Sequence, residues 1–388
     1  MNIIIFEDNS GFLVPFSINH SPIELRIGAI NNFDRIKNIF SNDKIILVVR
    51  DSLKRVIKEK FPECEVNPEY IPKGVCLNGS AIFKNEHSDA ILATKALSNN
   101  NSLISFHLNK DVHIESFNDL IDENIDVTKS CDIDVINNLW DIFSLSEPMI
   151  KYDYQNFHYN NNYSFHHSLI RINEDQIYIG NNSEIKAGIV LDATSGPIII
   201  DDNVVLEHGV IVEGPCYIGK NSLISPNSII RKNNIIGPMC KIGGEVTCCN
   251  ILGYSNKVHD GFLGHSYIGE WVNIGAGTNN SNLKNNYSLV KVQFENILLD
   301  TKLKFLGSLI GDYTRISIGT NLNTGSYLGI GVNLFNHDFS KKYIPSFSWG
   351  DTDKVKIELL IETIIKMKKR RSCKLTLAEE KLINYLYK

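Results

Sequence analysis

The feature that most constrains the fold is an aliphatic residue that recurs at every sixth position through the middle of the chain. One series comprises Ile200, Leu206, Val212, Ile218, Ile224, Ile230, Ile236 and Ile242, and a second comprises Ile310, Ile316, Leu322, Leu328 and Leu334. A period of six matches neither an α-helical turn nor the simple alternation of an amphipathic strand. It is typical of a triangular solenoid, in which each short strand contributes one inward aliphatic side chain.

The corners of such a solenoid need left-handed backbone conformations, which glycine and asparagine tolerate. Asn181, Asn203, Asn221 and Asn233 recur at the spacing that corners require. The pattern resembles hexapeptide-repeat proteins, and that resemblance, not the period, implies a left-handed parallel β-helix. A repetitive scaffold without chemistry is an open alternative at this point.

The two ends of the chain differ from the repeats. Near the N-terminus, short β-like runs alternate with helical patterns, which is typical of an α/β domain. We expect this domain and its connector over residues 1–165, the β-helix over 166–350 and a helical tail over 351–388. The tail contains two helical patterns, Lys354 to Arg370 and Thr376 to Tyr387.

Composition excludes several classes of protein. A net charge of −5 offers no basic field for nucleic acid, and the basic run from Lys366 to Arg371 is expected to be the solvated face of a helix. No apolar stretch is long enough to span a bilayer, and the first residues lack the pattern of a signal peptide. The eight cysteines have no zinc-site spacing and are typical of reduced thiols. We therefore expect a cytoplasmic protein without nucleic-acid or membrane partners.

The six-residue phase breaks between Ile242 and Ile268, and the break contains His259 and His265. Chemistry is often located where a regular pattern fails. We expect Val258, not His259, to point inward in the aliphatic phase. Farther on, the segment Ser281 to Asn285 is too polar for a coil and is expected to loop out.

Four strings in this half of the chain resemble the bifunctional N-acetylglucosamine-1-phosphate uridyltransferase/glucosamine-1-phosphate acetyltransferase family, in particular a divergent bacterial branch with an altered N-terminal domain. They are Gly253 to Gly261, Asn273 to Thr278, Ser281 to Asn285 and Ile344 to Gly350. The resemblance implies a homotrimer that transfers acetyl from acetyl-CoA to an amino-sugar 1-phosphate. Such a reaction would serve nucleotide-sugar biosynthesis for the cell envelope.

The resemblance also implies roles for individual residues. His259 falls on the catalytic base, a role that suits an imidazole because it titrates near neutral pH. Asn282 would steady the reacting centre, Asn273 would contact the amino sugar, and Arg231 would hold the sugar phosphate. The backbone of Gly275, Ala276 and Gly277 would line the acetyl-CoA channel. His265 does not match the family base and is expected to be structural.

Two positions depart from the family pattern. Phe262 stands where the family has a tyrosine, and Thr247 stands where it has a phosphate-binding lysine. Lys257 or Lys284 is expected to compensate for that lysine in binding substrate. The departures leave the identity of the sugar open.

The N-terminal domain lacks the family's glycine-rich phosphate loop. Gly11 to Phe16 contains no Gly-x-Gly, whereas Ser21 to Gly28 carries Arg26, which is the candidate for a nucleotide phosphate. We favour a degenerate nucleotide-binding fold without activity over an active one. Because the two activities would occupy separate domains, we expect Arg26→Ala to leave acetyl transfer intact. An active domain would need Mg²⁺, whose ligands the sequence does not identify. Two alternatives are open: a sugar-1-phosphate nucleotidyltransferase with a structural β-helix stem, and a non-catalytic trimeric scaffold.

Overall fold

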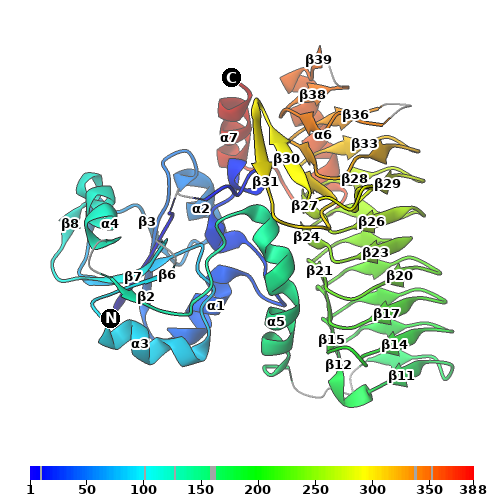
Figure 1. Cartoon of the computed structure of the whole chain (residues 1–388), viewed down its shortest axis with the longest axis horizontal. Coiled ribbons are helices and arrows are strands. Elements are labelled where there is room, and N and C mark those ends of the chain that lie inside the picture. Colours follow the sequence, from blue (N-terminus) through cyan, green and yellow to red (C-terminus); the bar gives the residue numbers. More distant parts are fainter. Residues whose placement is uncertain (9–10, 100–101, 126–127, 158–162, 336–338, 351–352) are drawn as a thin grey trace.

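The computed structural model describes the chain except residues 9–10, 100–101, 126–127, 158–162, 336–338 and 351–352 (Figure 1). An α/β domain lies beside a long parallel β-helix, and two helices follow the last coils. The fold class expected from the sequence is confirmed. In the described part of the chain, no helix combines the length and the apolar composition that crossing a membrane would require.

The N-terminal domain is built on a seven-stranded sheet of order β3-β2-β1-β5-β7-β6-β9. Its strands are β1 (Asn2–Phe6), β2 (Lys44–Val48), β3 (Glu65–Val66), β5 (Gly74–Asn78), β6 (Ala96–Asn99), β7 (Ser102–Leu108) and β9 (Lys129–Ser130), and a small separate ladder joins β4 (Tyr70–Ile71) to β8 (Val112–His113). The first four pair in parallel, whereas β7 runs antiparallel to β5. Strand β1 is apolar from Ile3 to Phe6 because both faces of the sheet are covered.

Four helices cover this sheet: α1 (Asn32–Ile39), α2 (Lys54–Lys60), α3 (Ser88–Ala93) and α4 (Phe117–Ile125). Ile3 and Ile5 of β1 belong to the same core cluster as Phe33 of α1. Ile4 packs in a second cluster with Phe117 of α4. Alternate residues of one strand therefore anchor helices on opposite faces.

Three faces make up the β-helix. The first face contains β10 (Ser164–Phe165), β13 (Glu184–Ile185), β16 (Val205–Leu206), β19 (Leu223–Ile224), β22 (Lys241–Ile242), β25 (Asn256–Lys257), β28 (Asn273–Ile274), β33 (Arg315–Ile316), β36 (Asn333–Leu334), β38 (Ser348–Trp349) and β39 (Asp353–Lys354). The second face contains β11 (Ile170–Ile172), β14 (Val190–Asp192), β17 (Ile211–Glu213), β20 (Ile229–Ile230), β23 (Glu245–Thr247) and β26 (Phe262–Gly264), and β29 (Asn279–Asn280) and β34 (Asn321–Leu322) follow it as a separate pair. The third face contains β12 (Ile177–Ile179), β15 (Ile198–Ile200), β18 (Cys216–Ile218), β21 (Asn234–Ile236), β24 (Asn250–Gly253), β27 (Tyr267–Glu270), β32 (Ser308–Ile310), β35 (Ser326–Leu328) and β37 (Tyr343–Ile344).

The six-residue aliphatic series forms the buried core of these coils. On the first face, parallel pairing places Ile224 beside Ile242 and Ile242 beside Lys257. Lys257 is 2% exposed, whereas Val258 is only partly buried. The expectation that Val258 points inward is therefore wrong, and the inward position is held by a lysine.

The phase break has a simple structural origin. The inward positions continue as Ile242, Val246, Ile251 and Lys257, so that the first two steps are shorter than six residues. After β29 the chain leaves the coils, forms the hairpin of β30 (Lys291–Phe294) and β31 (Ile297–Asp300), and returns at β32. The expected loop is confirmed, and the hairpin's Phe294 ring meets Phe12 of the N-terminal domain at 5.2 Å.

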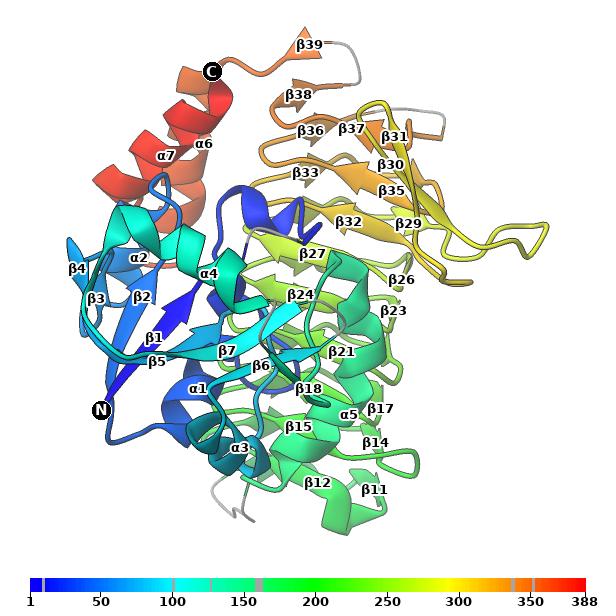
Figure 2. The ribbon, with the colours of Figure 1, turned by 60° about the vertical axis from the view of Figure 1, so that its left-hand side comes forward.

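Helices join the β-helix to the N-terminal domain. Helix α5 (Ile142–Tyr154) lies along the third face, where Ile150 packs with Ile199 and Tyr217 (Figure 2). Helix α6 (Ile357–Lys369) packs on the last coils, and α7 (Leu377–Tyr387) contributes Leu382 to the core of the N-terminal domain. The C-terminal helix α7 thus packs on the domain that the N-terminal part of the chain forms.

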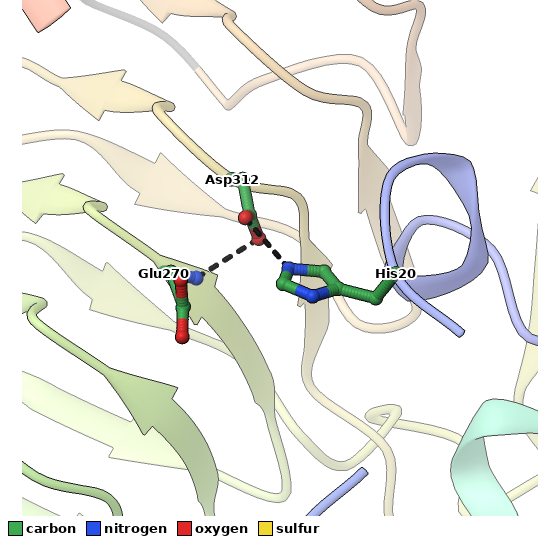
Figure 3. Close-up of side chains that lie close together, drawn as sticks. All are labelled: His20, Glu270 and Asp312. Atoms are coloured by element: carbon green, nitrogen blue, oxygen red, sulfur yellow. Dashed lines mark hydrogen bonds and ion pairs between the residues drawn. The ribbon is translucent and has the colours of Figure 1, made fainter. Parts of the chain in front are cut away.

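A buried ionic cluster fixes the contact between the N-terminal domain and the β-helix (Figure 3). His20 Nε2 lies 2.8 Å from Asp312 Oδ2, and His20 Nδ1 lies 3.2 Å from Glu24 Oε1, which also pairs with Lys60. Burial opposes a charge on His20, but the carboxylates of Asp312 and Glu24 raise its pKa from 6.5 to about 10. His20 is therefore an imidazolium that donates to both carboxylates.

We expect His20→Gln to weaken the domain contact, because Asp312 stays buried without its counter-charge, at a cost of about 3–5 kcal/mol. Since the pKa of His20 is higher in the folded state, its stabilising contribution is complete below pH 6.5 and is lost as the pH rises through about 10. Urea unfolding of wild type and variant across that range measures the difference. His208→Gln, at an exposed histidine, is the control. If the difference in unfolding free energy between wild type and His20→Gln did not shrink as the pH rises, His20 would not be a charged partner of Asp312.

Candidate active site

The corner between the first and second faces brings together several residues that the sequence singled out. His259 and Asp260 are exposed there, between β25 and β26. The N–H of Gly277 in the next coil donates to the Asp260 carbonyl at 3.3 Å, and the N–H of Gly319 one coil later donates to Ala276. The candidate base and the candidate acetyl-CoA glycines thus lie at one edge of consecutive coils.

This edge requires glycine at close approaches. A Cβ atom on Gly275 would lie 2.5 Å from the backbone nitrogen of Ile318, and Gly277 has a φ of +69°. A larger residue would therefore be strained at either position, at Gly275 by lack of space and at Gly277 by its backbone conformation. The result is a close-packed glycine corner beside His259, from which no side chain projects at Gly275 or Gly277.

Lys257 supports this corner from inside the β-helix. Its Nζ donates to the carbonyls of Gly243, His259 and Asp260 at 3.1, 2.9 and 3.3 Å. Burial lowers the pKa of its ammonium from 10.5 to about 8. The expected role of Lys257 in binding substrate phosphate is therefore wrong, because its amine is buried and engaged by the backbone.

A second cluster lies past β26, at the other end of the second face. Asn282 Nδ2 lies 2.9 Å from His265 Nδ1, and the His265 ring stacks on Phe305. Burial lowers the pKa of His265 from 6.5 to about 4, so that the neutral ring accepts at Nδ1 and carries its proton on Nε2. Sequence reasoning treated His265 as structural and missed its pairing with Asn282. The sequence signal that could have drawn attention to His265 was its position six residues after His259.

Asparagine side chains replace the backbone ladder beside this cluster. The N–H of Phe262 donates to Asn279 Oδ1 at 2.8 Å, and the N–H of Gly264 donates to Asn280 Oδ1 at 2.7 Å. Asn280 is buried in the interior of the coil. The strand pairing is therefore interrupted between β26 and β29, next to the two histidine-bearing corners.

The remaining candidates for substrate binding are dispersed. Arg231, on the second face, donates from Nε to Glu245 at 2.6 Å and lies 3.7 Å from Glu213. Asn273 is exposed on the first face, beside Arg315. Lys284 donates to the carbonyl of Leu289 within the segment that loops out.

Arg26 does not line the hollow of the N-terminal sheet. The carboxyl ends of the parallel strands surround a hollow of about 280 Å³ lined by Glu7, Arg50 and Asn67 among others. Arg26 instead packs on the ring of Tyr217, 5.4 Å from its centroid, and Asn250 binds its carbonyl. The assignment of Arg26 to a phosphate stays a prediction, but its contact with the β-helix removes the reason to expect that Arg26→Ala would leave that domain unaffected.

Of the three carboxylates that line this hollow, Glu7 is not free to bind Mg²⁺. Glu7, a carboxylate at the end of β1, accepts from the backbone N–H of Arg50 at 2.6 Å and from its guanidinium at 2.7 Å. A metal ion would have to displace both donors. Elsewhere in the described chain, His20, Glu270 and Asp312 are close enough to share an ion, but both His20 nitrogens already face carboxylates.

Comparisons with known proteins agree with the two-part architecture. Residues 3–161 match the family model described as sugar nucleotidyl transferase, and residues 197–232 match the model of the bacterial transferase hexapeptide, six repeats. Both are transferase families. The chain thus joins a sugar nucleotidyltransferase-like domain to hexapeptide repeats. No curated protein shows significant similarity to the sequence.

Three solved structures are distant likenesses. A UDP-N-acetylglucosamine acyltransferase from Campylobacter jejuni is 10% identical over 43% of this chain and 68% of its own, with a TM-score of 0.18. PerB from Caulobacter crescentus, in complex with CoA and GDP-perosamine, is 8% identical over 89% and 91%, with a TM-score of 0.16. A hexapeptide transferase family protein from Anaplasma phagocytophilum is 14% identical over 58% and 89%, with a TM-score of 0.11. Scores this low support no functional argument.

We expect Lys257→Met to loosen the His259 corner, because three carbonyls lose the donor that joins them, at about 1–3 kcal/mol. Hydrogen–deuterium exchange should rise over residues 256–262 and in the adjoining corner at 275–278. Lys220→Met, at an exposed lysine paired with Asp202, is the matched control and should leave these segments unchanged. Unchanged exchange in folded Lys257→Met would show that the lysine does not hold the corner.

Proposed function

We propose that the chain is an acetyl-CoA-dependent N-acetyltransferase that acts on an amino-sugar 1-phosphate in nucleotide-sugar biosynthesis. The observation that carries this proposal is the exposed His259 beside the glycine edge at Gly275–Gly277. A histidine next to backbone that permits close approach supplies the two parts that acyl transfer needs, a base and a channel for the thioester.

In the proposed reaction, His259 removes a proton from the amine as its nitrogen attacks the thioester carbonyl. A C–N bond forms, the C–S bond breaks, and the coenzyme A thiolate leaves with a proton returned by the imidazolium. Asn282, whose amide is held by His265, is the candidate for steadying the developing oxyanion. Arg231 would exchange its contact with Glu245 for the sugar phosphate, as its 44% exposed side chain permits.

A second activity, nucleotidylyl transfer by the N-terminal domain, is supported by the family match over residues 3–161. The Glu7–Arg50 pair in the hollow and the absence of a Gly-x-Gly string argue against it. Isotope exchange between pyrophosphate and nucleotide sugars would measure that activity separately from acetyl transfer. A protein with neither activity would be a scaffold.

We further propose that the protein is a cytoplasmic homotrimer. Ile318 is 75% exposed at the same edge as His259, and Phe335 is 43% exposed one coil later. Exposed apolar side chains at one edge are typical of a surface covered in an assembly. In a homotrimer, a neighbouring subunit would cover this edge.

Light scattering should give a mass three times the 43.8 kDa of one chain. Ile318→Asp should reduce that mass, because a carboxylate in the contact is costly to bury. Leu377→Asp, at a 67% exposed leucine on α7, should not change the mass and is the control. An active monomer would defeat the proposal of a trimer.

His259→Ala should lower turnover by roughly 10²–10⁴, the usual contribution of a positioned general base, with little change in acetyl-CoA affinity. Folding should survive because His259 is exposed and the inward position belongs to Lys257. The assay is thiol release from acetyl-CoA with a panel of amino-sugar phosphates. His208→Ala is the matched control, since His208 is an exposed histidine on the same edge three coils earlier. Equal turnover in both variants would remove His259 from the mechanism.

A further inference from the structure

A groove runs between the first face of the β-helix and helix α6. Its floor is a row of residues in register on successive strands: Lys241, Asn256, Asn273, Arg315, Asn333 and Trp349. Five inter-strand spacings make this row about 24 Å long. Two adjoining hollows of about 500 Å³ each lie along it, and both are lined by Arg315 and Thr363.

The groove is basic although the whole chain carries a net charge of −5. Six cations line the two hollows, namely Lys241, Arg315, Lys354, Lys356, Arg370 and Arg371. Glu362 is the one carboxylate in that lining, and it lies 2.7 Å from Lys366, so that it neutralises none of the six. This excess of positive charge is open to an anionic ligand.

Arg315 is the central cation of the groove. Its Nε is buried and has no hydrogen-bond partner among the described residues, and burial lowers the pKa of its guanidinium. A buried Nε without a partner is costly, and a bound phosphate group would supply acceptors in the geometry that a guanidinium matches. Arg370 and Arg371 line the same hollow, so this part of the basic run is not only a solvated helix face.

The end of the floor offers an aromatic surface. Trp349 follows Asn333 in the row, and 46% of its side chain is exposed. Exposed indole rings are suited to stacking on a nucleobase. The amide of Asn333 lies between this ring and Arg315, and that of Asn273 lies on the other side of Arg315, so both can donate to ribose or phosphate oxygens.

We propose that this groove binds a ligand that carries a nucleoside diphosphate, with the phosphates on Arg315, Arg370 and Arg371 and the base on Trp349. Coenzyme A and a nucleotide sugar share this chemistry. The proposal concerns binding alone and so goes beyond the proposed acetyl transfer. It survives if His259 proves not to be a base.

Isothermal titration of the full-length protein with coenzyme A, UDP and inorganic pyrophosphate tests the proposal. Arg315→Gln should weaken coenzyme A or UDP about tenfold, the usual effect of losing one charged hydrogen bond. Arg370→Gln, at an exposed site on the helix end, should act in the same direction without endangering the fold. Arg171→Gln, an arginine on the second face paired with Glu174, is the control and should bind like wild type.

Trp349→Ala separates the base from the phosphates. It should weaken coenzyme A or UDP and leave pyrophosphate unchanged. If coenzyme A binds more tightly than UDP, the ligand of the groove is coenzyme A; if UDP binds more tightly, the ligand is a nucleotide sugar. Failure of both to bind, or wild-type affinity in Arg315→Gln and Arg370→Gln, would overturn the proposal.

Discussion

The stacked inward column of aliphatic side chains is the constraint on which the rest of the structure depends. Because each coil places one such residue on each face, parallel pairing keeps neighbouring coils in register, as with Leu206, Ile224 and Ile242. Corners and outward positions are then in register as well. The edge that carries His259 and the row of residues through Arg315 are consequences of the same packing.

Polar residues enter the column only where the backbone can satisfy them. Lys257 binds three carbonyls, and Asn280 accepts from the Gly264 N–H and donates to its carbonyl. A buried polar group without such partners would cost about 1–3 kcal/mol. Both positions lie beside the irregular coils that carry His259 and His265. The local departure from an apolar core is therefore tied to the shape of the candidate site.

Sequence periodicity predicted the coils, the phase break and the looped segment, because each depends on local pattern. It did not predict which residue of the break points inward, since the steps to Val246 and Ile251 are shorter than six residues and a fixed count then fails. The position of Arg26 on Tyr217 was also out of reach, because that contact joins different domains. The ionic pair of His20 and Asp312 spans 292 residues for the same reason. The catalytic role of His259 stays a prediction.

Strand β28 links the two surfaces that carry the functional proposals. Asn273 points outward to the groove, Ile274 points inward to the column, and Gly275 begins the glycine edge beside His259. Adjacent strand residues are about 3.3 Å apart, so a ligand anchored by its phosphates in the groove needs to pass only a few residues to reach that edge. Because Ile274 holds β28 in the column, displacement of the groove floor would move the edge with it. The rigid core thus fixes the distance between the floor of the groove and the glycine corner beside the candidate base.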